Sequence, residues 1–263
     1  MVQYKPLPSS LTEDDLPETD NQPVDNELQV LIPILLRAIL ALLWAQTDWF
    51  LGVNIGLYYD SNLPPIGPDS FLSLGVPRYK SQRGRLSYVV AQENNIVPQW
   101  VLEVVSKTPG DEYIEKMTTY AQIGVLYYTI YNPDYWQREQ HDPFEVYRLV
   151  SGNYVRQYGN PVWMPEIGLG IGYEVGAHSG WTREWLYWYD GQGNRHPAPE
   201  DVIEQEQQLR EAIKQQLEQE RRLRSQAEQT AEQERQIRLQ SEHQLQQLLE
   251  RLRQQEINPD ETL

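Results

Sequence analysis

Two carboxylates and a lysine, at positions 69, 103 and 116, could together perform hydrolytic chemistry. Glu103 lies inside the apolar run Trp100–Val105, where burial favours the neutral acid unless a cation or hydrogen-bond donors compensate its charge. Asp69 opens another short apolar run thirty-four residues earlier. If the two runs are neighbouring strands, both acids can bind one divalent cation, with Lys116 or Lys107 close by. Such a site is typical of enzymes that hydrolyse phosphodiesters.

The elements that must position these residues follow from hydrophobic periodicity. Apolar residues recur at helical spacing over 28–44, and a second helix fits over 111–123 because Gly124 suits its C-terminal cap. Strands are predicted over 49–59, after Asp69, and over 86–91, 100–105 and 125–131. The run that contains Glu103 is apolar on both faces, so we expect this strand to be central in its sheet.

Beyond residue 133 the pattern predicts short antiparallel strands. Segments 144–149 and 154–158 flank a hairpin turn at 151–153, and a strand over 186–189 precedes another turn. Aromatic residues in this region could stack nucleic-acid bases or pack in a core. We favour the core, because strands without interleaved basic residues seldom form nucleic-acid surfaces. These residues are Trp181, Trp185, Tyr187, Trp188 and Tyr189.

The chain divides by composition into three segments. Residues 1–26 are acidic and proline-rich without periodicity, which predicts disorder. Residues 27–196 form the predicted domain. Residues 197–263 begin with Pro197-Ala198-Pro199 and continue as a Gln-, Glu- and Arg-rich helix. Half of the positions in its two heptad seams are polar, so a weak homotypic or heterotypic coiled coil and an exposed single helix held by Glu–Arg pairs both fit.

Composition narrows the cellular setting and the possible partners. The chain has no cysteine, which excludes disulfides and thiolate chemistry and fits a reducing cytoplasm, and its acidic N-terminus argues against an export signal. Arg37 interrupts the apolar helix, so we expect no membrane span. The four histidines show no metal-ligand spacing and are expected in loops or on the surface. They are His141, His178, His196 and His243.

The net charge of −16 opposes non-specific coating of nucleic acid. Segments 1–27 and 200–263 each carry −6, which leaves −4 for the middle of the chain, so attraction to a duplex must be local. Arg78, Lys80, Arg83 and Arg85 form the densest basic patch of this middle part. The patch is expected either to contact DNA phosphates beside the site or to be a solvated surface loop.

The order of motifs in the chain resembles the Uma-two family of restriction-endonuclease-like proteins, a branch of the PD-(D/E)XK nuclease superfamily. The resemblance covers roughly residues 24 to 190 and lies in Gly67-Pro68-Asp69, Glu103-Val104-Val105-Ser106, Asp111, Lys116, Tyr120 and Gly124–Pro133. It implies an α+β fold with a mixed central sheet flanked by helices, to which the chain adds its long C-terminal helix.

The resemblance also implies roles for individual residues. The superfamily lysine normally lies two residues after the glutamate, where this chain has Val105. In this branch Lys116 of the following helix would be the equivalent, and Lys107 is a weaker substitute. Glu27 matches the place of an auxiliary acid, although an acid at a helix N-terminus is also favoured by the helix dipole.

Two functions of different class follow. The first is a Mg²⁺-dependent DNA endonuclease, with Mn²⁺ as an alternative ion, in which Asp69 and Glu103 hold the metal and Lys116 orients water or neutralises the phosphate. The second is a catalytically silent nuclease-like scaffold whose C-terminal helix binds a partner or a second copy of the chain. A glycosidase that uses the same two acids is remote, because such sites usually lie in larger barrels or sandwiches.

Overall fold

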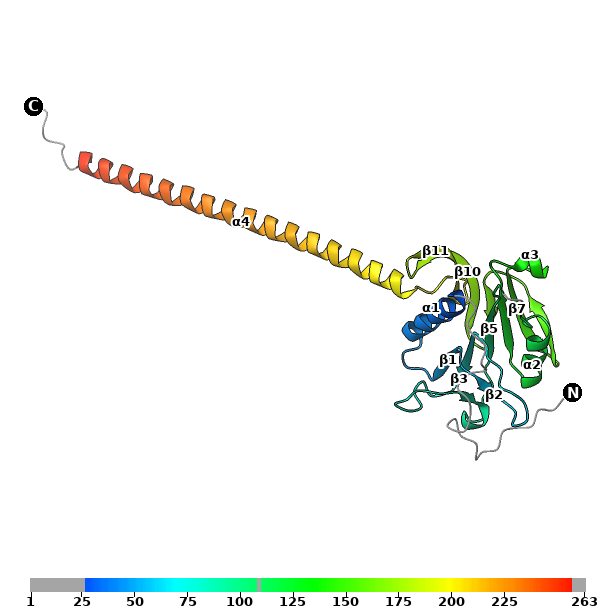
Figure 1. Cartoon of the computed structure of the whole chain (residues 1–263). Helices are drawn as coiled ribbons and strands as arrows, with labels where there is room; N and C mark the ends of the chain where they lie inside the picture. Colours follow the sequence, from blue (N-terminus) through cyan, green and yellow to red (C-terminus); the bar gives the residue numbers. More distant parts are fainter. Residues whose placement is uncertain (1–26, 108–109, 257–263) are drawn as a thin grey trace, which may run out of the picture. The chain divides into compact units, whose positions relative to one another are not determined.

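The computed structural model describes residues 27–107 and 110–256, with side chains up to residue 254 (Figure 1). The segment 1–26, for which we expect disorder, lies outside these residues, as does 257–263 at the end of the predicted C-terminal segment. The chain divides into two compact units, Met1–Val202 and Ile203–Leu263. The first unit contains every candidate site residue.

The first helix, α1 (Leu28–Leu43), is buried along one face. Ile32, Leu36 and Ile39 are inaccessible to solvent, and the indole Nε1 of Trp188 donates a hydrogen bond to the Leu36 carbonyl at 3.0 Å. The helix therefore packs inside the protein, as its periodicity predicted. Within residues 27–107 and 110–256, no helix is both long and apolar enough to span a bilayer.

The central sheet is mixed and has six strands in the order β1-β3-β5-β6-β7-β8. The neighbours β5 and β6 are parallel, and every other neighbouring pair is antiparallel. All five residues of β5 are buried, which confirms that the strand carrying Glu103 is central. The strands are β1 (Trp49–Val53), β3 (Ser70–Leu74), β5 (Trp100–Val104), β6 (Tyr127–Tyr131), β7 (Phe144–Val150) and β8 (Asn153–Gln157).

Two hydrophobic cores lie on opposite faces of this sheet. Trp100, Leu102 and Val104 of β5 belong to the core that contains α1, whereas Val101 and Val105 belong to the core that contains α2 (Glu115–Ile123). Because successive side chains of a strand point to opposite faces, Glu103 points towards α2. Glu103 is thus a charged residue at a position of β5 that faces the apolar core around α2.

The crossover from β5 to β6 contains α2, which is shorter than predicted. The helix begins at Glu115 and not at Asp111, whose carbonyl accepts a hydrogen bond from the Lys116 amide at 3.0 Å. It ends at Gly124, whose φ of 94° is the left-handed conformation that the sequence predicted for this cap. A single turn, α3 (Trp136–Glu139), follows β6.

Two predicted strands are shorter than their sequence patterns suggest. The segment 49–59 is split into β1 and β2 (Leu57–Tyr58), with Asn54 between them at a φ of 48°. The segment 86–91 contains only β4 (Tyr88–Val89) before a 3₁₀ turn over Val90–Gln92. Because β2 and β4 pair in parallel with each other, both are outside the central sheet.

A separate three-stranded sheet has the order β11-β10-β9 and was only partly predicted. It consists of β9 (Val162–Met164), β10 (Leu169–His178) and β11 (Trp181–Tyr189), whereas the sequence predicted a strand only over 186–189. Trp185, Tyr187, Trp188 and Tyr189 are buried, which confirms the expected core packing, but Trp181 is 41% exposed.

The second unit contains most of α4 (Pro199–Glu256), a continuous helix as predicted (Figure 1). Its charged residues form ion pairs one turn apart, such as Arg210 with Glu206 at 2.6 Å and Arg224 with Glu228 at 3.1 Å. Leucines along the helix remain exposed, with Leu209 at 61%.

Candidate active site

Asp69 and Glu103 lie opposite each other on adjacent antiparallel strands. Ser70 pairs with Leu102 in the ladder between β3 and β5, so the next pair along this ladder brings Asp69 across from Glu103. The Val104 amide donates a hydrogen bond to Asp69 Oδ2 at 2.6 Å. The expected neighbourhood of the two acid-bearing runs is therefore correct.

Glu103 is held by two side chains of α2. Its Oε1 accepts a hydrogen bond from the Tyr120 hydroxyl at 2.6 Å, and its Oε2 lies 2.9 Å from Lys116 Nζ. The glutamate is 1% exposed, whereas the lysine side chain is 30% exposed. Lys116 therefore joins a buried carboxylate to the solvent-facing side of the site.

Asp69 is held from the opposite layer of the protein. Its Oδ1 accepts a hydrogen bond from Gln29 Nε2 at 3.2 Å, and the aspartate is 8% exposed. Gln29 belongs to the first turn of α1. In the sequence this glutamine is only a polar interruption of an apolar helix, and its partner forty residues away leaves no local signal.

Because Asp69 and Glu103 are buried close together, it is energetically unfavourable for both to be ionised. Burial raises the pKa of Asp69 well above its usual range, and the charge of Glu103 adds to this rise, while the Val104 amide, Lys116 and Gln29 oppose it. Burial alone would lower the pKa of Lys116, but the charge and hydrogen bond of Glu103 raise it above its usual value. Lys116 is therefore a cation at physiological pH.

The hydroxyl of Tyr120 is fixed as a hydrogen-bond donor. Burial raises its pKa well above the usual value, and the charge of Glu103 adds to the rise. The sequence motif contains Tyr120 but does not indicate which group its hydroxyl contacts. The structure adds that the phenol fixes one oxygen of the glutamate.

A third buried carboxylate, Glu112, lies in the loop before α2 and was not predicted. Burial raises its pKa, while the charge of Lys116 lowers it and that of Glu103 raises it. A Cβ atom added at Gly110 would lie 2.1 Å from Glu112 Oε1, so a larger residue there would displace the end of the Glu112 side chain. Within residues 27–107 and 110–256, no three His, Cys, Asp or Glu side chains are grouped closely enough to hold a metal ion.

Lys107, the alternative lysine, and Glu27, the auxiliary acid, are both exposed. Lys107 is exposed, and its carbonyl accepts a hydrogen bond from Arg138 at 2.6 Å, whereas Lys116 provides the ammonium beside Glu103. Glu27 precedes α1 and is exposed. From this end of α1, Gln29 contacts Asp69.

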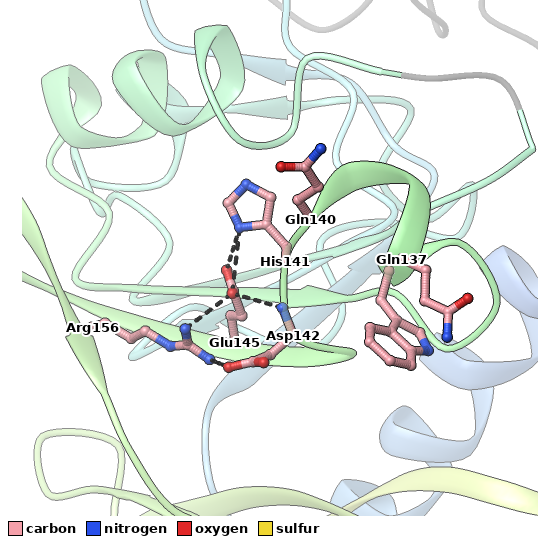
Figure 2. A pocket seen from close by; sticks show the side chains of 7 residues that line it. Gln137, Gln140, His141, Asp142, Glu145 and Arg156 are labelled. Carbon is pink, nitrogen blue, oxygen red and sulfur yellow. Dashed lines mark hydrogen bonds and ion pairs between the residues drawn. The ribbon is translucent and has the colours of Figure 1, made fainter.

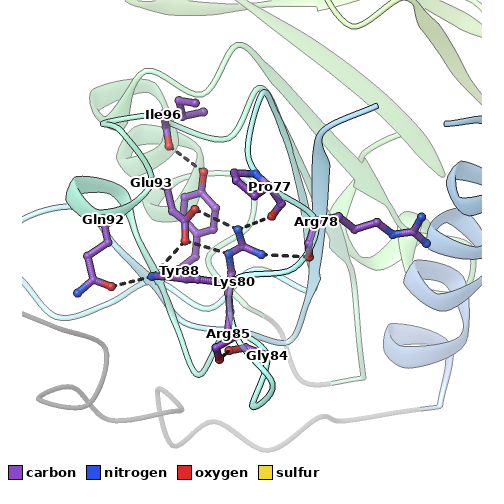
Figure 3. A network of polar contacts seen from close by, with 10 residues as sticks. Pro77, Arg78, Lys80, Gly84, Arg85, Tyr88, Gln92, Glu93 and Ile96 are labelled. Atoms are coloured by element: carbon purple, nitrogen blue, oxygen red, sulfur yellow. Dashed lines mark hydrogen bonds and ion pairs between the residues drawn. The ribbon is translucent and has the colours of Figure 1, made fainter. Parts of the chain in front are cut away.

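The basic loop at 78–85 contains one residue whose charge is already paired. Arg85 Nε lies 2.9 Å from Glu93 Oε1, and its Nη2 lies 3.1 Å from Oε2; the arginine side chain is 2% exposed (Figure 3). Arg85 also donates to the carbonyls of Pro77 and Arg78 and stacks over Phe50. The loop was expected either to contact DNA phosphates or to be solvated, whereas at Arg85 a buried bidentate pair with Glu93 holds the loop itself together.

The other basic residues of this loop remain nearer the surface. Lys80 Nζ lies 2.8 Å from Gln92 Oε1 and 3.4 Å from Glu93 (Figure 3). The Arg78 guanidinium lies 4.7 Å from the centre of the Trp49 ring. Arg83 is exposed.

The histidines are not all surface residues. His178 is 8% exposed at the end of β10, and its Nδ1 lies 2.6 Å from Glu200 Oε1. The ring of His141 stacks on Tyr113 with 3.7 Å between centroids. The expectation of a loop or surface position is therefore wrong for His178, which packs edge-on against Trp185.

The chemistry of this arrangement fits a hard divalent cation. Each of the four carboxylate oxygens of Asp69 and Glu103 accepts one hydrogen bond, from Gln29, Val104, Tyr120 or Lys116. An ionised carboxylate has about four lone-pair sites, so each acid keeps capacity for a metal ligand bond. Burial and, after it, repulsion from Glu103 raise the pKa of Asp69, and a shared cation would relieve this repulsion.

The chain is similar to a protein family and to a solved structure. The model of the Uma2 family, described as "Putative restriction endonuclease", matches residues 20–175, which is more than half of the chain. A solved structure described as "a putative nuclease belonging to DUF820", from Anabaena variabilis ATCC 29413, is 15% identical. The match covers 59% of this chain and 90% of that one, with a TM-score of 0.40. No curated protein matches the chain.

Proposed function

The chain belongs to the Uma2 family, and we propose that it is a metal-dependent endonuclease that hydrolyses phosphodiester bonds in DNA. The observation that carries the proposal is the convergence of Asp69 and Glu103 on adjacent strands, with Lys116 Nζ 2.9 Å from Glu103 Oε2. The description of the family as restriction endonucleases supports DNA as the substrate.

Asp69 and Glu103 would hold Mg²⁺, with Mn²⁺ as the alternative ion. Magnesium usually keeps several waters and binds to one or two carboxylates plus substrate phosphates, so two buried acids are a sufficient protein contribution. When bound, the ion supplies a Lewis acid for the charge on the phosphate and lowers the pKa of an attacking water.

The remaining residues would position these groups. Lys116 is held by Glu103 and charged, so its ammonium can donate to a phosphate oxygen as negative charge develops. Tyr120 fixes the other oxygen of Glu103, and Gln29 fixes Asp69. Arg83 would contact a neighbouring phosphate, which supplies local attraction within an acidic chain.

The proposal is tested by metal binding and DNA cleavage measured on the same variants. Titration calorimetry should detect Mg²⁺ or Mn²⁺ binding to the parent, and Asp69→Ala and Glu103→Ala should abolish it. The parent should nick plasmid DNA in the presence of the metal. Lys116→Met should keep metal binding and reduce cleavage by about 10²-fold or more, by analogy with removal of one electrostatic donor.

Lys107→Met is the matched control, because this lysine is exposed and does not provide the ammonium at Glu103. It should keep both metal binding and cleavage. A parent protein that binds neither ion and leaves plasmid DNA intact would contradict the endonuclease.

A second candidate function is a nuclease-like scaffold that recruits a partner through α4. The observation that favours it is the exposure of apolar residues along this helix, including Leu209 at 61%, Leu223 at 58% and Leu245 at 60%. Under this function the parent would bind no divalent metal, and the removal of α4 leucines would abolish association. Both functions can be distinguished by the same calorimetric titration.

A further inference from the structure

An open pocket of about 480 Å³ lies where α3 meets the start of β7 (Figure 2). Residues after β6 supply most of its wall, and one residue of β7 and one of β8 complete it. Besides Trp136, its lining consists of polar residues: Gln137, Gln140, His141, Asp142, Glu145 and Arg156.

The pocket lies on the same face of the sheet as the candidate active site. Glu103 pairs with Ile130, and Ile130 pairs with Glu145, so the two glutamates occupy one row across three strands. Because neighbouring strands are 4.7–4.9 Å apart, their backbones are roughly 10 Å apart. Arg138 of α3 also donates to the carbonyls of Ser106 and Lys107, directly after β5.

The charged groups of the pocket satisfy one another. Glu145 accepts hydrogen bonds from the Asp142 amide at 3.1 Å and the Tyr147 hydroxyl at 2.5 Å, and it lies 3.2 Å from Arg156. The guanidinium of Arg156 is also paired with the carboxylate of Asp142. With two acids and one arginine, the pocket is no site for a phosphate.

The groups that remain available are neutral. The side-chain amides of Gln137 and Gln140 and the indole of Trp136 make no hydrogen bond within residues 27–107 and 110–256, and Trp136 is 38% exposed. The His141 ring is held flat against Tyr113, with its Nδ1 3.4 Å from Glu145 Oε1. Amides that donate and accept, beside an aromatic ring, are the groups that bind the edges and faces of nucleobases.

We propose that this pocket binds an unpaired base of the nucleic-acid substrate, a few nucleotides from the phosphate that is cleaved. The inference rests on the proposed function and adds that the substrate contains an unpaired base. A duplex strand advances 3.4 Å per nucleotide, so roughly 10 Å corresponds to about three nucleotides. Because unpairing costs least at mismatched or single-stranded positions, the pocket favours these over intact duplex.

The test measures binding position by position. Fluorescence anisotropy gives the dissociation constant of a labelled single-stranded oligonucleotide, and of copies that carry one abasic residue at successive positions, with Ca²⁺ replacing Mg²⁺. In the parent, one abasic position should weaken binding by about tenfold, which is within the range for one lost stacking contact. In the double variant Gln137→Ala, Gln140→Ala and in Trp136→Leu this position dependence should disappear.

Two control variants match these changes. Gln192→Ala alters an exposed glutamine in the turn before α4, and Trp163→Leu alters a tryptophan of β9 that is 44% exposed. Both should retain the position dependence of the parent. Because the altered pocket side chains are exposed or partly exposed, thermal unfolding midpoints should stay at the parent value and exclude misfolding as the cause.

The outcomes separate this inference from the proposed function. Metal-dependent cleavage together with equal affinity for every abasic copy would overturn the base pocket and leave the endonuclease intact. Position-dependent binding without metal binding or cleavage would overturn the endonuclease and leave a base-binding surface. Position dependence that persists in the pocket variants would also overturn the base pocket.

Discussion

At the scale of single residues, the site combines groups that the sequence could and could not reveal. Glu103 attracts notice because a charged residue interrupts an apolar strand, and its partners are donors from α2. Gln29 carries no such signal, because its contact with Asp69 depends on how two distant elements pack. The sequence did not reveal that Arg85 is buried and paired, because a run of basic residues does not show which arginine is exposed.

Asp69→Asn should stabilise the protein at neutral pH while it abolishes cleavage. The folded protein raises the pKa of Asp69, so it binds this proton more tightly than the unfolded chain does. Below the ordinary carboxyl pKa of about 3.9 both states are protonated and no difference arises; as pH rises towards the folded-state pKa, the parent loses stability. Asparagine has no charge to lose, so its advantage should grow with pH.

Urea unfolding at pH 5 and pH 8 measures this difference. Asp190→Asn is a control of opposite sign, because hydrogen bonds from Asn194 lower the pKa of this exposed turn carboxylate. Its removal should reduce stability at both pH values, and the reduction should not grow between them. A pH-independent effect of Asp69→Asn would contradict the role of burial and of Glu103.

At the scale of elements, hydrophobic periodicity predicted the helices and strands that bury one regular apolar face. The helix over 28–44 and the strands at Asp69 and Glu103 were predicted because their apolar faces follow one repeat. Most of β10 was missed because Gly170, Gly172 and Gly176 break the apolar alternation. A Cβ atom at Gly172 would lie 2.5 Å from Asn160 Oδ1, so close approach of two segments, and not strand propensity, selects glycine there.

The loop between β3 and β4 should depend on the pair of Arg85 and Glu93. Arg85→Met removes the bidentate partner of buried Glu93 and leaves it with Lys80 at 3.4 Å, so it should lower the free energy of unfolding by up to about 3–5 kcal/mol. Arg83→Ala, at an exposed position of the same loop, should change it by less than about 0.5 kcal/mol.

Salt dependence of DNA binding completes this comparison. Arg83→Ala should reduce the slope of log K against log salt by about 1, as expected for one lost phosphate contact. Equal stabilities of the two variants would show that Arg85 does not hold the loop, and an unchanged slope would remove Arg83 from the DNA surface.

At the scale of the whole molecule, the sequence predicted the α+β class and the long helix but not the second sheet. The mixed central sheet and α4 match the prediction. The pairing of β2 with β4, and the packing of β11 against α1, depend on contacts between residues far apart in the chain. Such contacts depend on the complete fold, so local sequence patterns do not predict them.

We expect the chain to form dimers through α4. Leu209, Leu223 and Ile237 are 61%, 58% and 63% exposed, and a second copy of α4 would bury them. Light scattering should give twice the chain mass of 30.8 kDa. Leu223→Ser with Ile237→Ser should shift the protein to the monomer, whereas Gln226→Ser with Gln240→Ser should not; a monomeric parent would contradict the dimer.

The two acids of the site are secured from opposite layers of the protein, Asp69 by Gln29 of α1 and Glu103 by Lys116 and Tyr120 of α2. A chain in which either layer has not yet packed against the sheet would therefore lack part of this set of contacts. Under the proposed function, DNA cleavage would require the completely folded domain, and a partly folded copy would leave DNA intact.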